Sequence, residues 1–317
     1  MKRSGILLCA VLIGFLSQAQ RISPADFKFL KKKEDSLKVQ AFNITRGRTA
    51  SDRFTADSIF TRLLVRSLKT TNSFYYPFDS ILNVSKLYAP DSSFRIYTWQ
   101  LMINENTIRQ HGAIQMRTTD GSFKRFPLID KSDIAINPSD TIGSNETWIG
   151  AVYYKIIQKK YNGKTYYTLL GFDENNIRSD KKIMDILQFV NGEPVFGNPL
   201  FVIENSNPYQ KTMARFILEY KKDAASRLSY DAELDAIIYD ELVSETGDNK
   251  KKWTLVPDGD YEGFKWKNGK WVHTTNLFGG PPPKKYSAPL PVRDIKGTID
   301  DTKLKGGEPE IINTPKN

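Results

Sequence analysis

The residues best suited to chemistry in this chain are carboxylates near its C-terminal end. Asp258, Asp260 and Glu262 alternate along the sequence, so in an extended segment they share one face. Pro257 and Gly259 favour a loop instead, in which an Asp-Gly-Asp run could surround an oxygen-preferring ion such as Ca²⁺. The segment lacks the spacing of glycine and glutamate that a full calcium-binding loop requires. We therefore predict that the three carboxylates bind ligand and that the chain holds no metal.

Carboxylates elsewhere in the chain could serve hydrolysis. A glycosidase uses two carboxyl groups that face each other across a cleft, about 5–10 Å apart. The sequence supplies candidates but does not pair them, so the catalytic residues stay unassigned. A hydrolase of this kind requires that two members of one set converge on a single pocket: Asp173, Asp231, Asp235, Asp258 and Asp260.

Two tryptophans form a second candidate ligand surface. Trp266 and Trp271 flank Asn268-Gly269, and a two-residue turn there sets the two rings opposite each other. Exposed aromatic faces can stack on sugar rings or on prolines, although most aromatic side chains in a β protein are buried. Three lysines surround the pair and require contact with water. We predict that Trp266 and Trp271 form an exposed platform that binds ligand.

Other kinds of catalytic and metal chemistry find little support in the sequence. The chain has one cysteine, Cys9, and two histidines, His111 and His273, which lie far apart. Neither Gly-x-Ser-x-Gly nor His-Glu-x-x-His occurs. A Ser–His–acid triad stays open, because its members assemble only in space. Cysteine nucleophiles and zinc centres are disfavoured, and no cofactor is predicted.

The first nineteen residues have the pattern of a secretory signal peptide. A short basic start precedes an apolar stretch over residues 5–16, and residues 17–19 offer small side chains at a cleavage site. The apolar stretch is too short to cross a bilayer of about 30 Å as a helix. We predict a signal peptide at 1–19, loss of Cys9 with it, and no transmembrane span in the mature chain. Export without thiols favours a bacterial periplasm or the cell exterior, including association with the outer membrane.

The formal net charge of +10 comes mainly from an N-terminal segment, residues 20–72. Residues 21–70 carry twelve Lys or Arg against five Asp or Glu. Helix-start signals and apolar spacing predict helices over about 24–40 and 52–69. The basic surface is either a solvated helical face or a surface that attracts an acidic partner. Nucleic acid is a poor candidate for an exported chain without a nucleic-acid-binding motif.

From residue 73 to residue 278 the sequence has the pattern of β strands. Runs rich in β-branched and aromatic residues alternate with turn residues, and Asn-Gly pairs mark hairpins at 162–163, 191–192 and 268–269. Three further segments are predicted to form a meander: 214–221, 227–231 and 236–243. Short connections favour sequential antiparallel pairing. We predict a mainly β fold, an antiparallel meander forming a curled sheet, sandwich or open barrel, with N-terminal helices.

The C-terminal tail, residues 279–317, differs in composition from the rest of the chain. It contains a run of three prolines, further prolines, glycines and charges, and few large apolar side chains. Such a segment cannot bury enough apolar surface to offset the entropy lost on ordering. The tail is therefore predicted to be disordered.

Three segments of the chain resemble exported β-rich proteins of the Bacteroidetes type. These segments are Tyr76 to Ser80, Leu169 to Asp173, and Thr254 to Phe264. The resemblance covers most of residues 50–275 and leaves out the tail. It implies a bacterial, exported location. It implies no activity, and no catalytic or binding residue is carried over from it.

The sequence contains no assembled catalytic signature, and its aromatic residues are spread through predicted strands. This combination favours a protein that binds rather than catalyses. We predict an exported, non-catalytic binding or envelope-associated protein whose partner is an envelope protein or a glycan. The alternative is a glycan-directed hydrolase that uses carboxylates in a β cleft.

Overall fold

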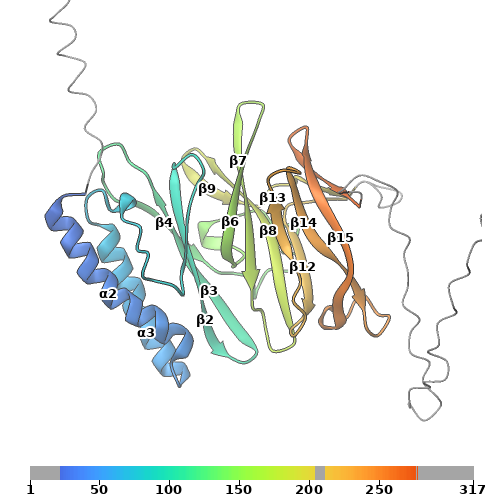
Figure 1. The fold of residues 1–317 in the computed structure, drawn as a ribbon, viewed down its shortest axis with the longest axis horizontal. Coiled ribbons are helices and arrows are strands. Elements are labelled where there is room, and N and C mark those ends of the chain that lie inside the picture. The colour runs from blue at the N-terminus through green and yellow to red at the C-terminus, as the bar shows by residue number, and fades with distance from the viewer. Residues whose placement is uncertain (1–21, 204–210, 276, 278–317) are drawn as a thin grey trace, which may run out of the picture. The chain divides into compact units, whose positions relative to one another are not determined.

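The structure is a computed structural model that describes residues 22–203, 211–275 and 277. Two predicted segments lie outside these residues, namely the signal peptide at 1–19 and the tail at 279–317. The described residues belong to a single unit that extends to Leu277. Helices come first and strands follow, which confirms the prediction of a mainly β protein with N-terminal helices (Figure 1).

Helix α2 (Pro24–Arg46) opens the described part of the chain. The hydroxyl group of Ser23 accepts a hydrogen bond from the amide of Asp26 at 3.0 Å, which satisfies a free donor of the first turn. The helix continues past its predicted end at residue 40. Ala41 and Ile44 are both buried, so they extend the apolar face that holds the helix against the protein.

Helix α3 (Ala50–Leu68) closely matches the helix predicted at 52–69. It begins with a capping box, in which the side chains of Thr49 and Asp52 each accept a hydrogen bond from the other's backbone amide. The two helices pack against each other and against strand β2 (Phe94–Asn104), as Figure 1 shows. Within the described ranges, no helix has both the length and the apolar character needed to cross a membrane.

The strands form three sheets, and none of them closes into a barrel within the described residues. The first sheet has the order β1 (Ser85–Tyr88), β2, β3 (Thr107–Met116), β4 (Lys124–Ile129). The second has the order β5 (Gly143–Ser144), β9 (Glu193–Phe196), β8 (Ser179–Val190), β7 (Lys164–Asp173), β6 (Val152–Tyr161), and β12 (Phe216–Lys221) also pairs with β8. The third has the order β11 (Lys211–Met213), β10 (Phe201–Ile203), β16 (Lys270–Thr274), β15 (Leu255–Lys267), β14 (Ala236–Ser244), β13 (Leu228–Asp231). Single 3₁₀ turns occur at η1 (Ser73–Tyr75), η2 (Asn145–Thr147) and η3 (Lys252–Thr254).

Asn-Gly turns join three hairpins at the predicted places. Both residues of each turn have positive φ, with values of 48° and 73° at 162–163, 53° and 82° at 191–192, and 48° and 78° at 268–269. This is the conformation of a type I′ turn, which asparagine and glycine adopt at little steric cost. The turns connect β6 to β7, β8 to β9, and β15 to β16.

The predicted meander after residue 214 is wrong. Strand β12 pairs with β8 in the second sheet, whereas β13 and β14 pair with each other in the third. In the β12–β8 pair, Phe216 lies opposite Met184 and Lys221 lies opposite Ser179. Leu218 is buried in the core between the second and third sheets. Burial of this side chain, rather than the short connection to β13, therefore decides which strand β12 joins.

Buried carboxylates fix the two helices on the rest of the protein. Glu34 of α2 is 8% exposed and accepts a hydrogen bond from Tyr76 Oη at 2.6 Å. Asp57 of α3 accepts one from Trp99 Nε1 at 2.7 Å, and His111 Nδ1 lies 2.9 Å from the same oxygen. A buried carboxylate without partners is costly, so these contacts favour a single docking position for the helices.

Arg95 of β2 is fully buried among aromatic rings. Its guanidinium carbon lies 4.7 Å from the ring centre of Tyr97, 4.9 Å from Tyr88, 5.5 Å from Phe78 and 5.9 Å from Phe74. The guanidinium group also donates hydrogen bonds to Tyr88 Oη at 2.7 Å and to backbone carbonyls of residues 73 and 76. Ring faces and carbonyl dipoles thus take the place of a counter-ion, and they join the segment after α3 to the first sheet.

A second buried arginine has a carboxylate partner. Arg215 Nη2 lies 2.9 Å from Asp185 Oδ2, and the two side chains are 1% and 0% exposed. Asp185 belongs to β8, and Arg215 immediately precedes β12. The ion pair therefore connects the beginning of β12 to the centre of the second sheet.

Arg215→Met should lower the free energy of unfolding by about 3–5 kcal/mol, because Asp185 would stay buried without a cationic partner. Chemical denaturation followed by tryptophan fluorescence measures this loss. The matched control is Lys221→Met, which breaks an exposed pair with Glu245 at 3.0 Å and should cost about 0–1 kcal/mol. Equal losses in the two variants would show that the buried pair does not support the fold.

Candidate functional site

A cavity of about 550 Å³ lies beside strand β12, between the second and third sheets. Its walls come from β7, β8 and β12, from β14 and β15, and from parts of the connection over residues 132–149. The volume falls within the range of small-ligand sites, about 300–1,000 Å³. Its titratable lining includes Asp173, Lys181, Glu219, Tyr239, Glu241 and Glu262.

One wall carries a row of charged side chains across three neighbouring strands. Lys181 of β8 pairs with Asp173 of β7 on one side and with Glu219 of β12 on the other. Partners in register project to the same face of a sheet, so the three side chains lie in one line. Glu219 accepts a hydrogen bond from Ser179 Oγ at 2.6 Å, and Lys181 donates one to Asn175 Oδ1 at 2.7 Å. Local hydrogen bonds therefore hold this wall in place.

Asp173 is the most buried member of the row, with 5% of its surface exposed. Its Oδ1 atom accepts hydrogen bonds from Gln110 Nε2 at 2.9 Å and from the amide of Asn175 at 2.8 Å. Burial raises the pKa of the Asp173 carboxyl group, and the nearby Lys181 opposes that shift. A carboxyl group with a raised pKa can carry a proton at higher pH than usual, which is the property that a general acid needs.

Arg215 fixes another part of the cavity wall. Its backbone amide donates a hydrogen bond to the carbonyl of Ser139 at 2.8 Å, and its Nη1 atom donates one to the carbonyl of Pro138 at 2.5 Å. Pro138 and Ser139 both line the cavity. Since Arg215 is also paired with Asp185, one side chain connects this wall to the strand that carries Lys181.

Glu262, a predicted ligand-binding residue, lies in the wall formed by the third sheet. Tyr239 Oη donates a hydrogen bond to Glu262 Oε2 at 2.9 Å, and His273 Nε2 lies 3.2 Å from the same oxygen. Burial raises the pKa of Tyr239 well above its usual value, so its hydroxyl group stays a donor at neutral pH. The carboxylate is thus held by two neighbouring strands.

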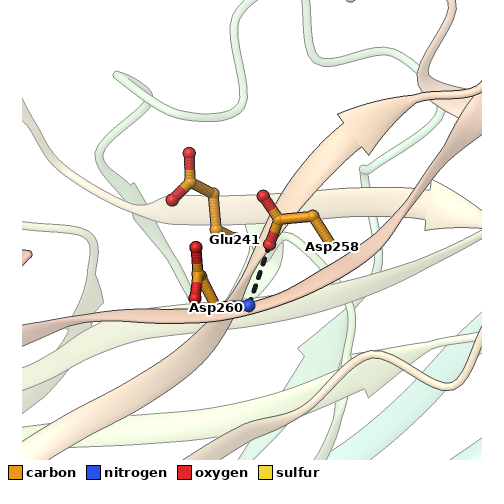
Figure 2. A group of neighbouring side chains, drawn as sticks. All are labelled: Glu241, Asp258 and Asp260. Atoms are coloured by element: carbon orange, nitrogen blue, oxygen red, sulfur yellow. Dashed lines mark hydrogen bonds between the residues drawn. The ribbon is translucent and has the colours of Figure 1, made fainter. Parts of the chain in front are cut away.

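Asp258 and Asp260, also predicted ligand-binding residues, meet Glu241 of β14. Carboxylate oxygens of the three residues lie within 4.8 Å of one another, and Figure 2 shows them side by side. The amide of Asp260 donates a hydrogen bond to Asp258 Oδ1 at 3.0 Å. The aspartates lie in β15 rather than in the expected loop, and a register shift between Asp240 and Leu242 interrupts the pairing there. Such a group could hold a hard cation, and its mutual repulsion equally favours a cationic side chain.

The predicted exposed platform of Trp266 and Trp271 does not form. The two residues do face each other across the hairpin, with ring centres 5.3 Å apart. Trp271 is completely buried, however, and its Nε1 atom donates a hydrogen bond to Thr168 Oγ1 at 2.8 Å in the core. The physical reason is that β16 pairs with β10 as well as β15, which places Phe201 next to Trp271. Trp266 is half-buried and contacts Tyr166.

The carboxylates proposed for a hydrolase occupy several places in the fold. Among them, only Asp173 belongs to the described lining of the cavity, so the prediction that two members of this set converge on one pocket is wrong. Asp231 accepts a hydrogen bond from the amide of Glu233 in the turn after β13, and Asp235 forms an ion pair with Lys159. Asp258 and Asp260 reach the cavity only through their contact with Glu241.

Sequence patterns did not identify Lys181, Glu219 and Glu241 as site residues. Lys181 and Glu219 become neighbours through the β8–β12 pairing, which joins segments that are distant along the chain. The one local signal is the alternation of Leu218 and Tyr220 with Glu219 and Lys221, which indicates a strand with one apolar face. That signal shows which side chains point inward but not which strand they join.

Asp173→Asn should raise the melting temperature more at neutral pH than at acidic pH. Folding raises the pKa of Asp173, so the contribution of its carboxyl group to stability is full below the unfolded-state pKa and is lost as the pH rises through the folded-state pKa. Asparagine keeps an oxygen acceptor and cannot ionise. Melting curves of both proteins between about pH 3 and about pH 8 measure the difference.

Asp52→Asn is a control with the opposite sign. Hydrogen bonds from the backbone and side chain of Thr49 lower the pKa of Asp52. Asp52 therefore contributes stability above its unfolded-state pKa and loses it as the pH falls through the folded-state pKa. The variant should melt at a lower temperature than the parent at neutral pH and should approach it in acid. Parallel pH profiles for the two variants would contradict both assignments.

No protein-family model, curated protein or solved structure matches this chain. What the protein does must therefore be inferred from the geometry of the described residues. The cavity beside β12 combines a volume suited to a small ligand with charged side chains that hydrogen bonds hold in place.

Proposed function

We propose that this protein is an exported, non-catalytic binding protein of the cell envelope, which holds its ligand in the cavity beside β12. The cavity carries the proposal because apolar side chains such as Leu218 and Leu242 share its lining with charged ones. Such a mixture is typical of sites that bind and orient a ligand. The pattern of residues 1–19 supports the exported location.

The order already present in the walls also supports binding. Glu219, Lys181 and Glu262 each make hydrogen bonds or close polar contacts within the protein. Side chains that are fixed before association lose less conformational entropy when a ligand arrives. The cavity is therefore suited to take a ligand without a large rearrangement of its walls.

A photoreactive benzoylphenylalanine at Ile217 should form a covalent adduct with the ligand in envelope fractions, because Ile217 is half-buried and lines the cavity. Denaturing electrophoresis and mass spectrometry identify the adduct. The matched control carries the same group at Val190, which is 50% exposed at the end of β8 and does not belong to the described lining. Adducts at neither position, or equal yields at both, would overturn the proposal.

A glycan-directed hydrolase is the second candidate, and the raised pKa of Asp173 favours it. Glu219 lies two strands away from Asp173 in the same row, which corresponds to about 10 Å between their backbones. Inverting glycosidases separate their two carboxyl groups by about 6.5–9.5 Å. Asp173 would donate the proton, and Glu219 would act as the base.

If this second function is correct, the purified protein should release reducing ends from oligosaccharides, and Asp173→Asn should slow the release by about 100-fold or more. Glu245→Gln is the control, since Glu245 is exposed and pairs with Lys221 outside the cavity. Release that is equal in both variants, or no release by the parent protein, would reject the hydrolase.

A further inference from the structure

Among the described residues, the edge of β12 that faces away from β8 has backbone groups without a backbone partner. The amide of Lys222 donates a hydrogen bond to the carbonyl of Arg178. Because backbone groups alternate in direction along a strand, every second residue counted back from Lys222 directs its amide and carbonyl toward β8. Arg215 belongs to the other set of alternate residues, and its amide points away from β8 and donates a hydrogen bond to the carbonyl of Ser139. Ile217 and Glu219 share the alternation of Arg215. Their amides and carbonyls therefore face outward, and no backbone partner for them occurs in the part of the chain that the structure describes.

The cavity extends around this free edge. Phe216 and Leu218, on one face of β12, line it together with Tyr239 and Leu242 of β14. Glu219, on the other face of β12, lines it together with the remainder of its charged row. An added strand would therefore place alternate side chains against an apolar wall and against a polar wall. Extended peptides that add to a sheet edge are recognised in this way, through backbone hydrogen bonds and alternating pockets.

The described lining of the cavity holds more carboxylates than lysines, which favours a cationic occupant. Its described lining holds four carboxylates, Asp173, Glu219, Glu241 and Glu262, against two lysines, Lys181 and Lys252. Glu241 is also in contact with two further carboxylates of β15. The chain as a whole carries a formal net charge of +10, so this excess of negative charge is local. A lysine or arginine side chain is complementary to it.

The connection that lines the cavity presents apolar side chains to solvent. Ile134, Ile136 and Ile142 are 69%, 101% and 55% exposed, and Pro138 and Ser139 of the same connection belong to the cavity wall. Exposed apolar side chains that follow one another on a single connection favour a surface that contacts other proteins. This favours a peptide that belongs to a larger protein over a free small molecule.

We propose that the ligand is an extended segment of a partner protein, which adds as a strand to β12 and places a lysine or arginine side chain beside Glu241. The segment alternates basic or polar residues with apolar ones, to match the two walls. Its backbone pairs with Ile217 and Glu219. This inference rests on the proposed binding function and specifies the class of ligand.

The test uses the full chain and a short synthetic peptide in which lysine and valine alternate. Hydrogen exchange followed by NMR should show that the peptide slows the exchange of the Ile217 and Glu219 amides by about tenfold or more. A copy of the peptide with methylated backbone nitrogens lacks the donors and should not bind. A peptide that alternates glutamate and valine should bind more weakly than the lysine peptide.

A pair of variants tests the charge. Glu241→Gln should weaken binding of the lysine peptide by about fivefold in calorimetric titration. Glu105→Gln is the matched control, because Glu105 is exposed in the turn between β2 and β3 and lies outside the described lining. Equal affinities in the two variants would overturn the assignment of the basic side chain to Glu241.

Two results would overturn strand addition. One is binding of the lysine peptide without slower exchange at Ile217 and Glu219. The other is slow exchange of both amides in the protein alone, which would mean that another part of this chain or a second copy already covers the edge. A cross-linked ligand at Ile217 together with failure of the peptides would leave the binding function standing and reject only the peptide class.

Discussion

The contact between Arg215 and Asp185 is the interaction on which the geometry of the cavity depends. Two charges taken out of water cost several kcal/mol each unless they are paired and hydrogen-bonded. The pair meets this condition at 2.9 Å, and the guanidinium group also reaches the carbonyls of Pro138 and Thr141. One side chain therefore ties β8, the start of β12 and a cavity wall into a single network. Such a network resists partial rearrangement, because the loss of one member leaves the other polar groups buried without partners.

The N-terminal half of the protein meets the same constraint with different partners. Among the described residues, Arg95 makes no ion pair with a carboxylate, and it is surrounded by aromatic faces and carbonyl oxygens. Glu34 accepts a hydrogen bond from a tyrosine, and Asp57 accepts one from a tryptophan and lies beside a histidine. Buried polar groups thus determine how the helices meet the first sheet, whereas apolar contact alone would allow several positions. The cavity between the other two sheets contains charged side chains that stay partly exposed, such as Lys181 and Glu219.

Local signals explain how much of this structure could be predicted from sequence. The cap at Ser23, the apolar spacing of α3 and the Asn-Gly turns act within a few residues, and the helices and hairpins they define are present. The partner of β12 could not be predicted, because it depends on which strand buries Leu218. The same limit applies to the site. Glu262 was identified from its residue type, but its neighbours Tyr239 and His273 come from other strands, and the burial of Trp271 follows from a strand that pairs with it in parallel.

That parallel pair has a consequence for folding. Phe201 of β10 lies opposite Trp271 of β16, so the core between the second and third sheets stays incomplete until nearly the whole described chain has been placed. Pairings between distant segments form slowly, because a long loop must close before they contribute. During that interval one side of β10 remains open to strands from other molecules. The hairpin of β15 and β16 thus completes this core, and a delay in its placement leaves the edge of β10 open to aggregation.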